Sequence, residues 1–539
     1  MATSHSTESG ALREAQPVRQ KSGLVRSASG FDAFVFSLAG ISVGIMLEWG
    51  NFFGRGFYPG ASEALALVIS TLAALVIAWA YQYWGQIFPR SGGDYVFLSR
   101  GAHPGFALGA NFVYCWILMV SPAFAMSIMQ PLFSSFASAL SDSTGWHWLA
   151  RLSGWFATDW GYATIGTLDL LIAAGIAVFG LKRAIQYMKV LFLTGFIGEI
   201  ILIVALLFSN SSTFTRHVEQ ATGQSAAAIE KAATGSGYAS GGFSFWHTMQ
   251  LTNWFTTSLF FAALLLYIGG EIKNVGRSIR YAMVAAVTFC GIGTLVWIAA
   301  LAHVMPARLQ GALAWNYFSA PAHSTAQQPY AHELMKILWG THGGGLILSI
   351  IGYLSALAWV TLWTPLVLSF TQRGVLAWAL DGLTPRWVGS VNERWHTPIP
   401  ALVIAFLMGE SFMLAFAFHA SWRTIILLVP LFVGIGVTML VGTLFPFLRK
   451  DFVQQSTVAE AKLFGIHKMA IFCGIGTLIM GFWAWLMWDD HVASGTDRTP
   501  IWVTAGIVAG ITIYYFALRA YKRSQGEDIS VTFKRIPVE

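Results

Sequence analysis

Long apolar blocks alternate with short polar stretches along the whole chain. A helix needs about 20 apolar residues to cross the hydrocarbon core of a bilayer, and the blocks reach this length. The blocks lack the alternation of polar and apolar residues that a membrane β-barrel shows. Lipid offers no hydrogen-bond partner to unpaired backbone N–H and C=O groups, so we expect only helices. The expected helices cover residues 31–53, 61–87, 104–133, 162–181, 186–209, 246–271, 279–305, 341–372, 399–419, 424–448, 464–488 and 499–522. The pattern therefore predicts an all-α integral membrane protein with about 12 transmembrane helices.

Composition and cysteine placement agree with this class. Of the 539 residues, 55% are hydrophobic and 11% are charged, whereas a soluble domain carries about 25% charged residues. Cys115, Cys290 and Cys473 all fall inside apolar blocks, which argues against a disulfide framework or a metal site. We expect no cofactor and no metal.

The net charge of +7 is explained by membrane topology rather than by a basic surface that binds nucleic acid. If the N-terminus is cytoplasmic, Lys and Arg concentrate in the tails and in the loops on that same side. This bias obeys the positive-inside rule, so both termini are expected in the cytoplasm and the protein in the cytoplasmic membrane. The two long loops, 210–245 and 306–340, then face outside. No nucleic-acid partner is expected.

The chain divides into a membrane core and two polar tails. Residues 1–30 lack the apolar segment of a signal peptide, so we expect a disordered cytoplasmic tail there. Residues 31–450 are expected to hold helices 1–10, residues 451–522 helices 11 and 12, and residues 523–539 a cytoplasmic C-terminal tail.

Three detailed motifs follow the second, sixth and eighth apolar blocks. They are Y-Q-Y-W-G-Q-I-F-P-R-S-G-G-D-Y at 81–95, E-I-K-N-V-G-R-S-I-R at 271–280 and Q-R-G-V-L-A-W-A-L-D-G-L-T-P at 372–385. In the first motif Pro89 ends a helix, and the Ser-Gly-Gly run after it permits a tight reversal. All three motifs lie on the side expected to be cytoplasmic.

Together these motifs resemble those of the amino acid–polyamine–organocation permease superfamily. Its members carry P-x-S-G-G-x-Y, E-x-K-N-P-x-R and R-x-x-x-A-x-A-x-D-G-x-x-P after the same three helices, and Val275 is a departure from the second pattern. The resemblance implies two inverted repeats of five helices, with helices 1 and 6 broken, plus two extra helices. It also implies a gate at the cytoplasmic mouth built from Ser91, Gly92, Gly93, Glu271, Arg373 and Asp381.

The resemblance places a substrate site at the break in helix 1. The segment A-G-I-S-V-G-I-M at 39–46 is similar to the glycine-rich break of the family, so the substrate-binding residues there are Ile41, Ser42, Val43 and Gly44. Unwinding exposes N–H groups that attract a carboxylate and carbonyls that attract an ammonium, as an amino acid requires. The alternative is close helix packing through Gly40 and Gly44.

The break in helix 6 is expected near residues 257–261, where the customary glycine is absent. Short polar side chains there can bond backbone groups that a break frees, and an aromatic ring can cap the substrate. The alternative is an unbroken helix. The residues concerned are Thr256, Thr257, Ser258, Phe260 and Phe261.

Titratable residues at membrane depth are costly and are therefore candidates for ion coupling. Glu199 lies well inside helix 5, where a buried carboxyl can carry a proton. Ser355 in helix 8 can supply an oxygen ligand for sodium, and Lys189 lies nearer the cytoplasmic end of helix 5. We expect H⁺ as the coupling ion, with Na⁺ as the alternative. Glu199 has a second explanation, a purely structural hydrogen bond to a neighbouring helix.

These observations predict a secondary active transporter that moves amino acids by alternating access. A polyamine or organic-cation transporter and an amino-acid exchanger are alternatives in the same class, and a transporter-like nutrient sensor is one in a different class. The chain has no P-loop, zinc-protease motif or nucleophile elbow, so we expect no enzyme. The expected partners are an amino acid or amine and the lipid bilayer. No cysteine lies in an expected external loop, so no obligatory protein partner is indicated.

Overall fold

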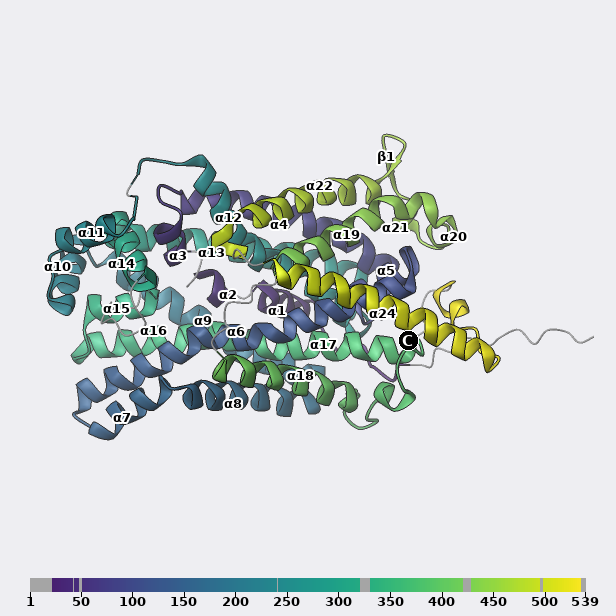
Figure 1. Ribbon diagram of the computed structural model, residues 1–539, viewed down its shortest axis with the longest axis horizontal. Coiled ribbons are helices and arrows are strands. Elements are labelled where there is room, and N and C mark those ends of the chain that lie inside the picture. Colours follow the sequence, from purple (N-terminus) through teal and green to yellow (C-terminus); the bar gives the residue numbers. More distant parts are fainter. Residues whose placement is uncertain are drawn as a thin grey trace, which may run out of the picture.

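The long helices run along the longest axis of the molecule and form one bundle (Figure 1). The computed structural model describes residues 22–41, 43–47, 51–239, 241–319, 330–419, 428–494 and 498–534. Within these residues, 11 helices are long and apolar enough to cross a membrane, and α1 (Gly30–Ile41) is a shorter apolar helix. The protein is therefore an all-α, multi-pass membrane protein, as the apolar blocks predict.

The membrane-spanning helices follow the expected blocks in order. They are α4 (Glu63–Ile87), α6 (Pro104–Thr144), α8 (Asp159–Val178), α9 (Leu181–Leu207), α12 (Phe245–Leu259) continuing as the 3₁₀ helix η2 (Phe260–Glu271), α13 (Val275–Val304), α16 (Gly343–Thr361) continuing as α17 (Trp363–Leu380), α18 (Ile399–Phe418), α19 (Leu428–Leu448), α22 (Lys468–Asp489) and α24 (Thr499–Ser524).

The helix α6 extends beyond the expected end at 133 and contains two prolines, Pro122 and Pro131. A proline cannot donate to the carbonyl four residues earlier, and lipid cannot replace that donor. The Ser121 hydroxyl donates to the carbonyl of Leu118 (2.5 Å), and the Tyr330 hydroxyl donates to that of Ser127 (3.3 Å). Both carbonyls freed by proline thus have partners, and the helix continues.

Shorter elements connect the spans. They are α2 (Val43–Ile45), α3 (Asn51–Phe57), α5 (Gly93–Gly101), α7 (His147–Phe156), α10 (Ser211–Thr222), α11 (Ala226–Gly235), α14 (Ala307–Ser319), α15 (Ala331–Trp339), α20 (Lys450–Val453), α21 (Thr457–Glu460), α23 (His491–Ser494) and the 3₁₀ helices η3 (Arg386–Gly389) and η5 (Ile529–Lys534). The strands β1 (Lys462–Leu463) and β2 (Ile466–His467) pair antiparallel, with Lys462 opposite His467.

The two long loops contain helices, which we name the helical cap: α10, α11, α14 and α15. Side chains cap the N-termini of α10 and α11. Asn210 accepts from the N–H of Thr213 (2.9 Å), and Ser225 accepts from the N–H of Ala228 (3.2 Å). Asn316 of α14 donates to the carbonyl of Ile229 in α11 (3.2 Å). The cap lies at one end of the bundle, opposite α5 and the C-terminus (Figure 1).

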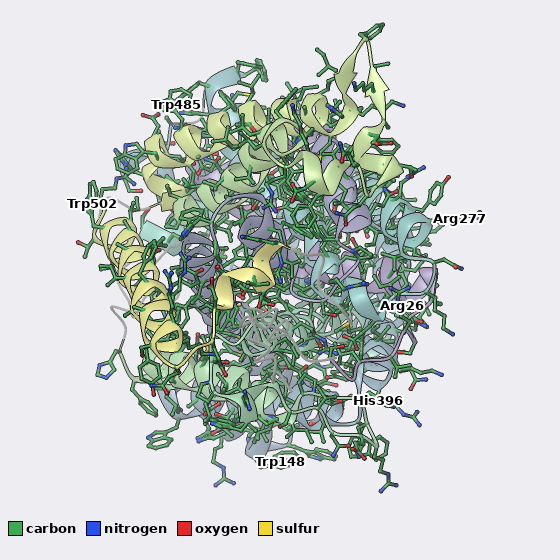
Figure 2. All side chains as sticks on the ribbon, turned by 90° about the vertical axis from the view of Figure 1, so that its right-hand side faces the viewer. Arg26, Trp148, Arg277, His396, Trp485 and Trp502 are labelled. Atoms are coloured by element: carbon green, nitrogen blue, oxygen red, sulfur yellow. The ribbon has the colours of Figure 1, made fainter. Side chains whose placement is uncertain are left out.

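Tryptophans mark the periphery of the bundle. Viewed along its long axis, Trp148, Trp485 and Trp502 lie at the outer edge, and between 51% and 70% of their surface is exposed (Figure 2). Indoles with one polar edge favour the membrane–water interface. Their placement agrees with a bundle that is surrounded by lipid.

Candidate functional site

The expected break in helix 1 falls at Ser42 and the residues beside it. The described parts of this helix are α1 up to Ile41, α2 over Val43–Ile45 and α3 from Asn51. Of the expected site residues, Ile41, Val43 and Gly44 are buried, and Ser42 lies outside the described residues. A side chain at Gly44 would come within 2.9 Å of Val360 in α16, so only glycine fits this approach.

Helix 6 changes its hydrogen-bonding pattern at Phe260, where α12 gives way to the 3₁₀ helix η2. The Thr256 and Thr257 hydroxyls bond back to the carbonyls four residues earlier, at 2.7 and 2.6 Å. Ser258 is buried beside them. The residues expected at the break therefore surround the change of helix type.

Helix α1 and the first residues of η2 lie side by side. The Ser37 hydroxyl of α1 donates to the carbonyl of Ala262 in η2 (2.9 Å), and a side chain at Gly40 would overlap the carbonyl of Phe261. Backbone groups of η2 are thus within reach of α1. Helix α1 and η2 therefore pack directly against each other.

Phe260 and Phe261 face different neighbours. The Phe260 ring packs against Phe432 and Trp483, at centroid distances of 5.7 and 6.2 Å, and so points toward α19 and α22. The Phe261 ring lies 5.6 Å from the Trp363 ring at the start of α17. Of the two rings, Phe261 is the one that faces α17, while its backbone carbonyl lies against Gly40 of α1.

The Ser91-Gly92-Gly93 turn packs between η2 and α17. Gly92 and Gly93 have φ values of +110° and +45°, which favour glycine. The Gly92 N–H donates to the carbonyl of Tyr267 (3.1 Å), and a side chain at Gly93 would overlap the Tyr267 ring. The turn thereby joins the loop after helix 2 to the end of helix 6.

Glu271 and Arg373 form a buried ion pair next to this turn. Arg373 donates from Nε to Oε1 (2.8 Å) and from Nη2 to Oε2 (3.2 Å), and their side chains are only 3% and 2% exposed. The fork of the guanidinium matches the carboxylate geometry, which gives the pair direction as well as charge. The pair ties the end of η2 to α17.

Asp381 pairs with Arg100 of α5, which the sequence interpretation did not place in the gate. Arg100 donates to both carboxylate oxygens (2.6 and 2.9 Å), and Tyr95 donates to Oδ2 (2.7 Å). Arg373, Ala377 and Asp381 recur every four residues and so share one face of α17. Ala377 meets Gly92 between the two ion pairs. We name this part of the bundle the ion-paired end.

Both described ends of the chain lie at the ion-paired end. The N–H groups of Ser27 and Ala28 donate to the carbonyl of Glu271 (3.0 Å each), and Lys273 donates to that of Ala28 (2.8 Å). At the other terminus, the Arg100 guanidinium lies 5.0 Å from the Phe533 ring in η5.

The candidate coupling residues fall into two separate places. The Ser355 hydroxyl donates to the carbonyl of Gly195 (2.8 Å) and lies 3.4 Å from Glu199 Oε2. Lys189 instead pairs with Asp32 at the start of α1. Lys189 and Glu199 are ten residues apart on α9, roughly 15 Å along the helix, so the structure brings Ser355 but not Lys189 to Glu199.

The sequence also matches a known protein family. The family model described as amino acid permease matches residues 34–517. The chain belongs to this amino acid permease family. No curated protein matches the chain as a relative. The permease is thus a multi-pass membrane transporter for a small molecule and not an enzyme.

The sequence interpretation missed one acid of the permease at membrane depth. Asp169 lies inside α8, is 7% exposed and accepts a hydrogen bond from the Thr364 hydroxyl of α17 (2.5 Å). The signal was present, since an acid in the middle of an apolar block is costly wherever it occurs. Asp169 belongs with Glu199 among the candidates for ion coupling.

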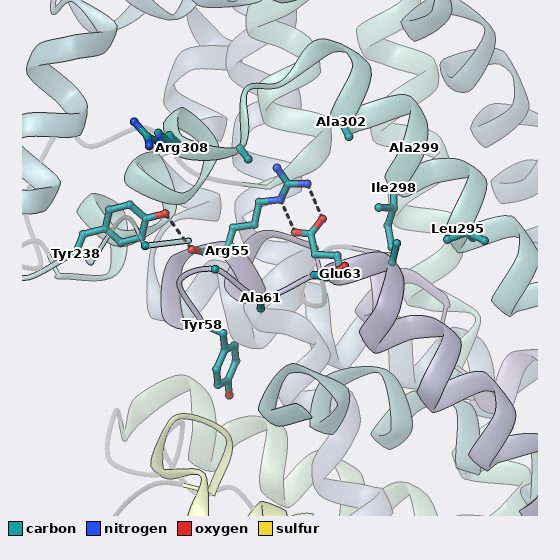
Figure 3. Close-up of a pocket in the computed structure, with 15 residues that line it drawn as sticks. Arg55, Tyr58, Ala61, Glu63, Tyr238, Leu295, Ile298, Ala299, Ala302 and Arg308 are labelled. Atoms are coloured by element: carbon teal, nitrogen blue, oxygen red, sulfur yellow. Dashed lines mark hydrogen bonds and ion pairs between the residues drawn. The ribbon is translucent and has the colours of Figure 1, made fainter. Parts of the chain in front are cut away.

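A cavity of about 420 Å³ lies near the helical cap of the permease, beside α3 (Figure 3). Arg55 donates to both oxygens of Glu63 (2.7 and 2.9 Å), and the Tyr238 hydroxyl donates to the Arg55 carbonyl (3.3 Å). Burial alone lowers the pKa of Arg55, but the adjacent Glu63 carboxylate raises it above its ordinary value. The pair neutralises its own charge and braces α3 against α4.

Proposed function

We propose that the permease is a secondary active transporter that moves amino acids across the cytoplasmic membrane by alternating access, with protons as the coupling ion. The observation that carries this proposal is the contact between α1 and η2, where helix 6 changes its hydrogen-bonding pattern. The end of α1 lies against the first residues of η2, joined by the bond from Ser37 to the carbonyl of Ala262. Carboxylate and ammonium groups bind best at helix interruptions, and the glycine-containing segment 39–46 that follows in helix 1 is proposed to supply the second one.

The substrate-binding residues proposed for this site are those expected from the sequence. Ile41, Val43 and Gly44 supply backbone from helix 1, together with Ser42. Phe261 supplies the aromatic cover, since its backbone lies against Gly40 of α1 and its ring faces Trp363, while the Phe260 ring points toward α19.

The ion-paired end is proposed to be the closed cytoplasmic gate. The Glu271–Arg373 and Arg100–Asp381 pairs each join α17 to a different element, η2 or α5. Alternating access requires such contacts to break when one half of the bundle rocks against the other. The N-terminal segment 22–29 adds backbone bonds to the same closed arrangement.

Glu199 is the proposed proton carrier. It is 8% exposed, contacts Ser355 of helix 8, and lines a cavity together with Val43 and Leu47 of helix 1. A change of charge on Glu199 therefore alters the electrostatic potential close to the substrate site. Ser355 remains the proposed sodium ligand if sodium replaces the proton.

Uptake of labelled amino acids into proteoliposomes tests the proposal, with an imposed pH gradient, a sodium gradient or neither. We expect saturable uptake that acid outside increases, and Glu199→Gln should remove this increase. Glu410→Gln is the matched control, because Glu410 also lies in a span and accepts from Thr167 (2.6 Å) but does not border helix 1. If no amino acid accumulates under any gradient although the protein is folded, amino-acid symport is wrong.

A further inference from the structure

A second cavity, which we name the Glu199 cavity, lies in the wall of the bundle. Its volume is about 230 Å³. Residues of α9, α13 and α16 surround it, with Val43 and Leu47 at its inner side. Ile200 and Ile292 at its mouth are 45% and 60% exposed. Since exposed apolar side chains of a spanning helix face lipid, the cavity opens toward the bilayer.

Four aromatic rings and one carboxylate line the cavity. The rings are those of Phe196, Phe289, Trp297 and Trp359, and Glu199 is the charged residue among the described residues of the lining. Aromatic faces attract a cation through their quadrupole, and tryptophan does so most strongly. A carboxylate enclosed by such faces is the chemistry that recognises an ammonium group.

The lining of the cavity also contains polar groups that make no hydrogen bond to the described residues. The Thr294 hydroxyl and the indole N–H groups of Trp297 and Trp359 are buried and have no hydrogen-bond partner among the described residues. Each of these side chains is at most 2% exposed. Buried donors without partners are rare, because each loses its bonds to water on folding. Such donors can bind the halide that accompanies an organic cation.

The two indoles are held in place. A side chain at Gly195 would come within 2.8 Å of the Trp359 ring, so α9 packs directly on that ring. The Trp297 ring stacks on His332 at a centroid distance of 6.0 Å and an angle of 23°. A preformed cage binds better than one that must order its side chains on binding.

We propose that the Glu199 cavity is a binding site for a membrane-soluble organic ammonium cation, distinct from the amino-acid site between α1 and η2. The ammonium group lies against Glu199 and the aromatic faces, and its apolar body extends toward Ile200 and Ile292. The cation enters from the bilayer, because the mouth of the cavity opens there. Since it occupies the carboxylate proposed to carry the proton, it acts as an inhibitor of coupled uptake.

Calorimetric titration of the full-length permease in nanodiscs tests this proposal, with empty nanodiscs subtracted. The probe is hexyltrimethylammonium, and hexanol and hexanoate have the same apolar body without the positive charge. We expect saturable binding of the cation alone. Glu199→Gln should weaken it at least tenfold and Trp297→Leu threefold or more, whereas Glu410→Gln should leave it unchanged.

Two results would overturn the proposal. One is equal binding of hexanol and the cation, which would make the cavity an ordinary lipid groove. The other is undiminished binding of the cation by both folded Glu199→Gln and folded Trp297→Leu protein. The titration uses no gradient and no amino acid, so its failure leaves the transport proposal intact. Conversely, Trp297→Leu should retain amino-acid uptake and lose only inhibition by the cation.

Discussion

Breaking the Glu271–Arg373 ion pair should open the ion-paired end of the bundle. Glu271→Gln keeps the shape of the side chain but leaves the Arg373 guanidinium, 2% exposed, without its counter-charge. An uncompensated buried charge costs about 3–5 kcal/mol. When this end is open, water hydrates the guanidinium, so the cost falls on the closed form.

This energetic cost sets the change in the ratio of open to closed protein. Arg373 keeps its bond to the Gln372 side chain and a contact with the Ser369 carbonyl (3.5 Å), so the lower figure of about 3 kcal/mol applies. At about 1.4 kcal/mol for each factor of ten, the ratio of open to closed protein rises roughly a hundredfold.

Accessibility of a cysteine at Ser91 measures this ratio. Ser91 is 3% exposed in the closed arrangement, and serine to cysteine is nearly isosteric. The three native cysteines are buried and can be replaced to remove any background. A membrane-impermeant maleimide should label Ser91→Cys protein about a hundred times faster when Glu271→Gln is present, because labelling tracks the open fraction.

The control is Glu393→Gln, which removes an exposed carboxylate from the loop after helix 8. It should leave the labelling rate unchanged. Exchanging the two charges, as Glu271→Arg with Arg373→Glu, should restore part of the protection. An unchanged rate in folded Glu271→Gln protein, or an equal rise in Glu393→Gln protein, would refute the reasoning.

Three further substitutions test the local geometry by thermal unfolding in detergent. Gly93→Ala should destabilise by at least about 1–2 kcal/mol, because φ is +45° and an aromatic ring of η2 occupies the space of a side chain; Gly434→Ala, with open space around it, should be neutral, and equal effects would contradict this. Arg100→Lys should cost about 1.5–3 kcal/mol, since an ammonium cannot make both bonds to Asp381; wild-type stability would show that the fork is dispensable. Lys189→Gln should change stability by about 0–1 kcal/mol and retain proton-driven uptake, because this ion pair is 29% exposed at the lysine; loss of the proton effect would return Lys189 to the coupling site.

The 11 long spans of the described residues were predictable from the sequence, because the length of an apolar block measures a membrane crossing directly. Two features were not. The helix α6 runs on to Thr144 through a polar segment that protrudes from the apolar block, where hydropathy carries no signal. The helical cap formed from segments that were expected as loops, because their alanine content favours helices that are stabilised by packing against α3, α13 and α16.

The candidate site was predictable in part. The motifs gave the glycine turn, Glu271, Arg373 and Asp381, and the structure brings them to one end. The partner of Asp381 was not visible, because Arg100 lies 281 positions away in the chain and only the fold brings them together. The direction in which the Phe261 side chain points could not be predicted either. Adjacent residues of a 3₁₀ helix point about 120° apart, and the sequence does not show how the helix is rotated about its own axis.

The helical cap has a practical consequence for holding the permease in one state. Its helix α14 lies against α3, with Ala314 Cβ 2.9 Å from the position of a side chain at Gly56 and the Phe318 ring 5.5 Å from that of Phe57. The same helix bonds to α11, which belongs to the connection between helices 5 and 6. An antibody fragment that clamps α11 to α14 would therefore hold α3 still. Raised against this epitope, such a reagent would trap a single conformer for imaging.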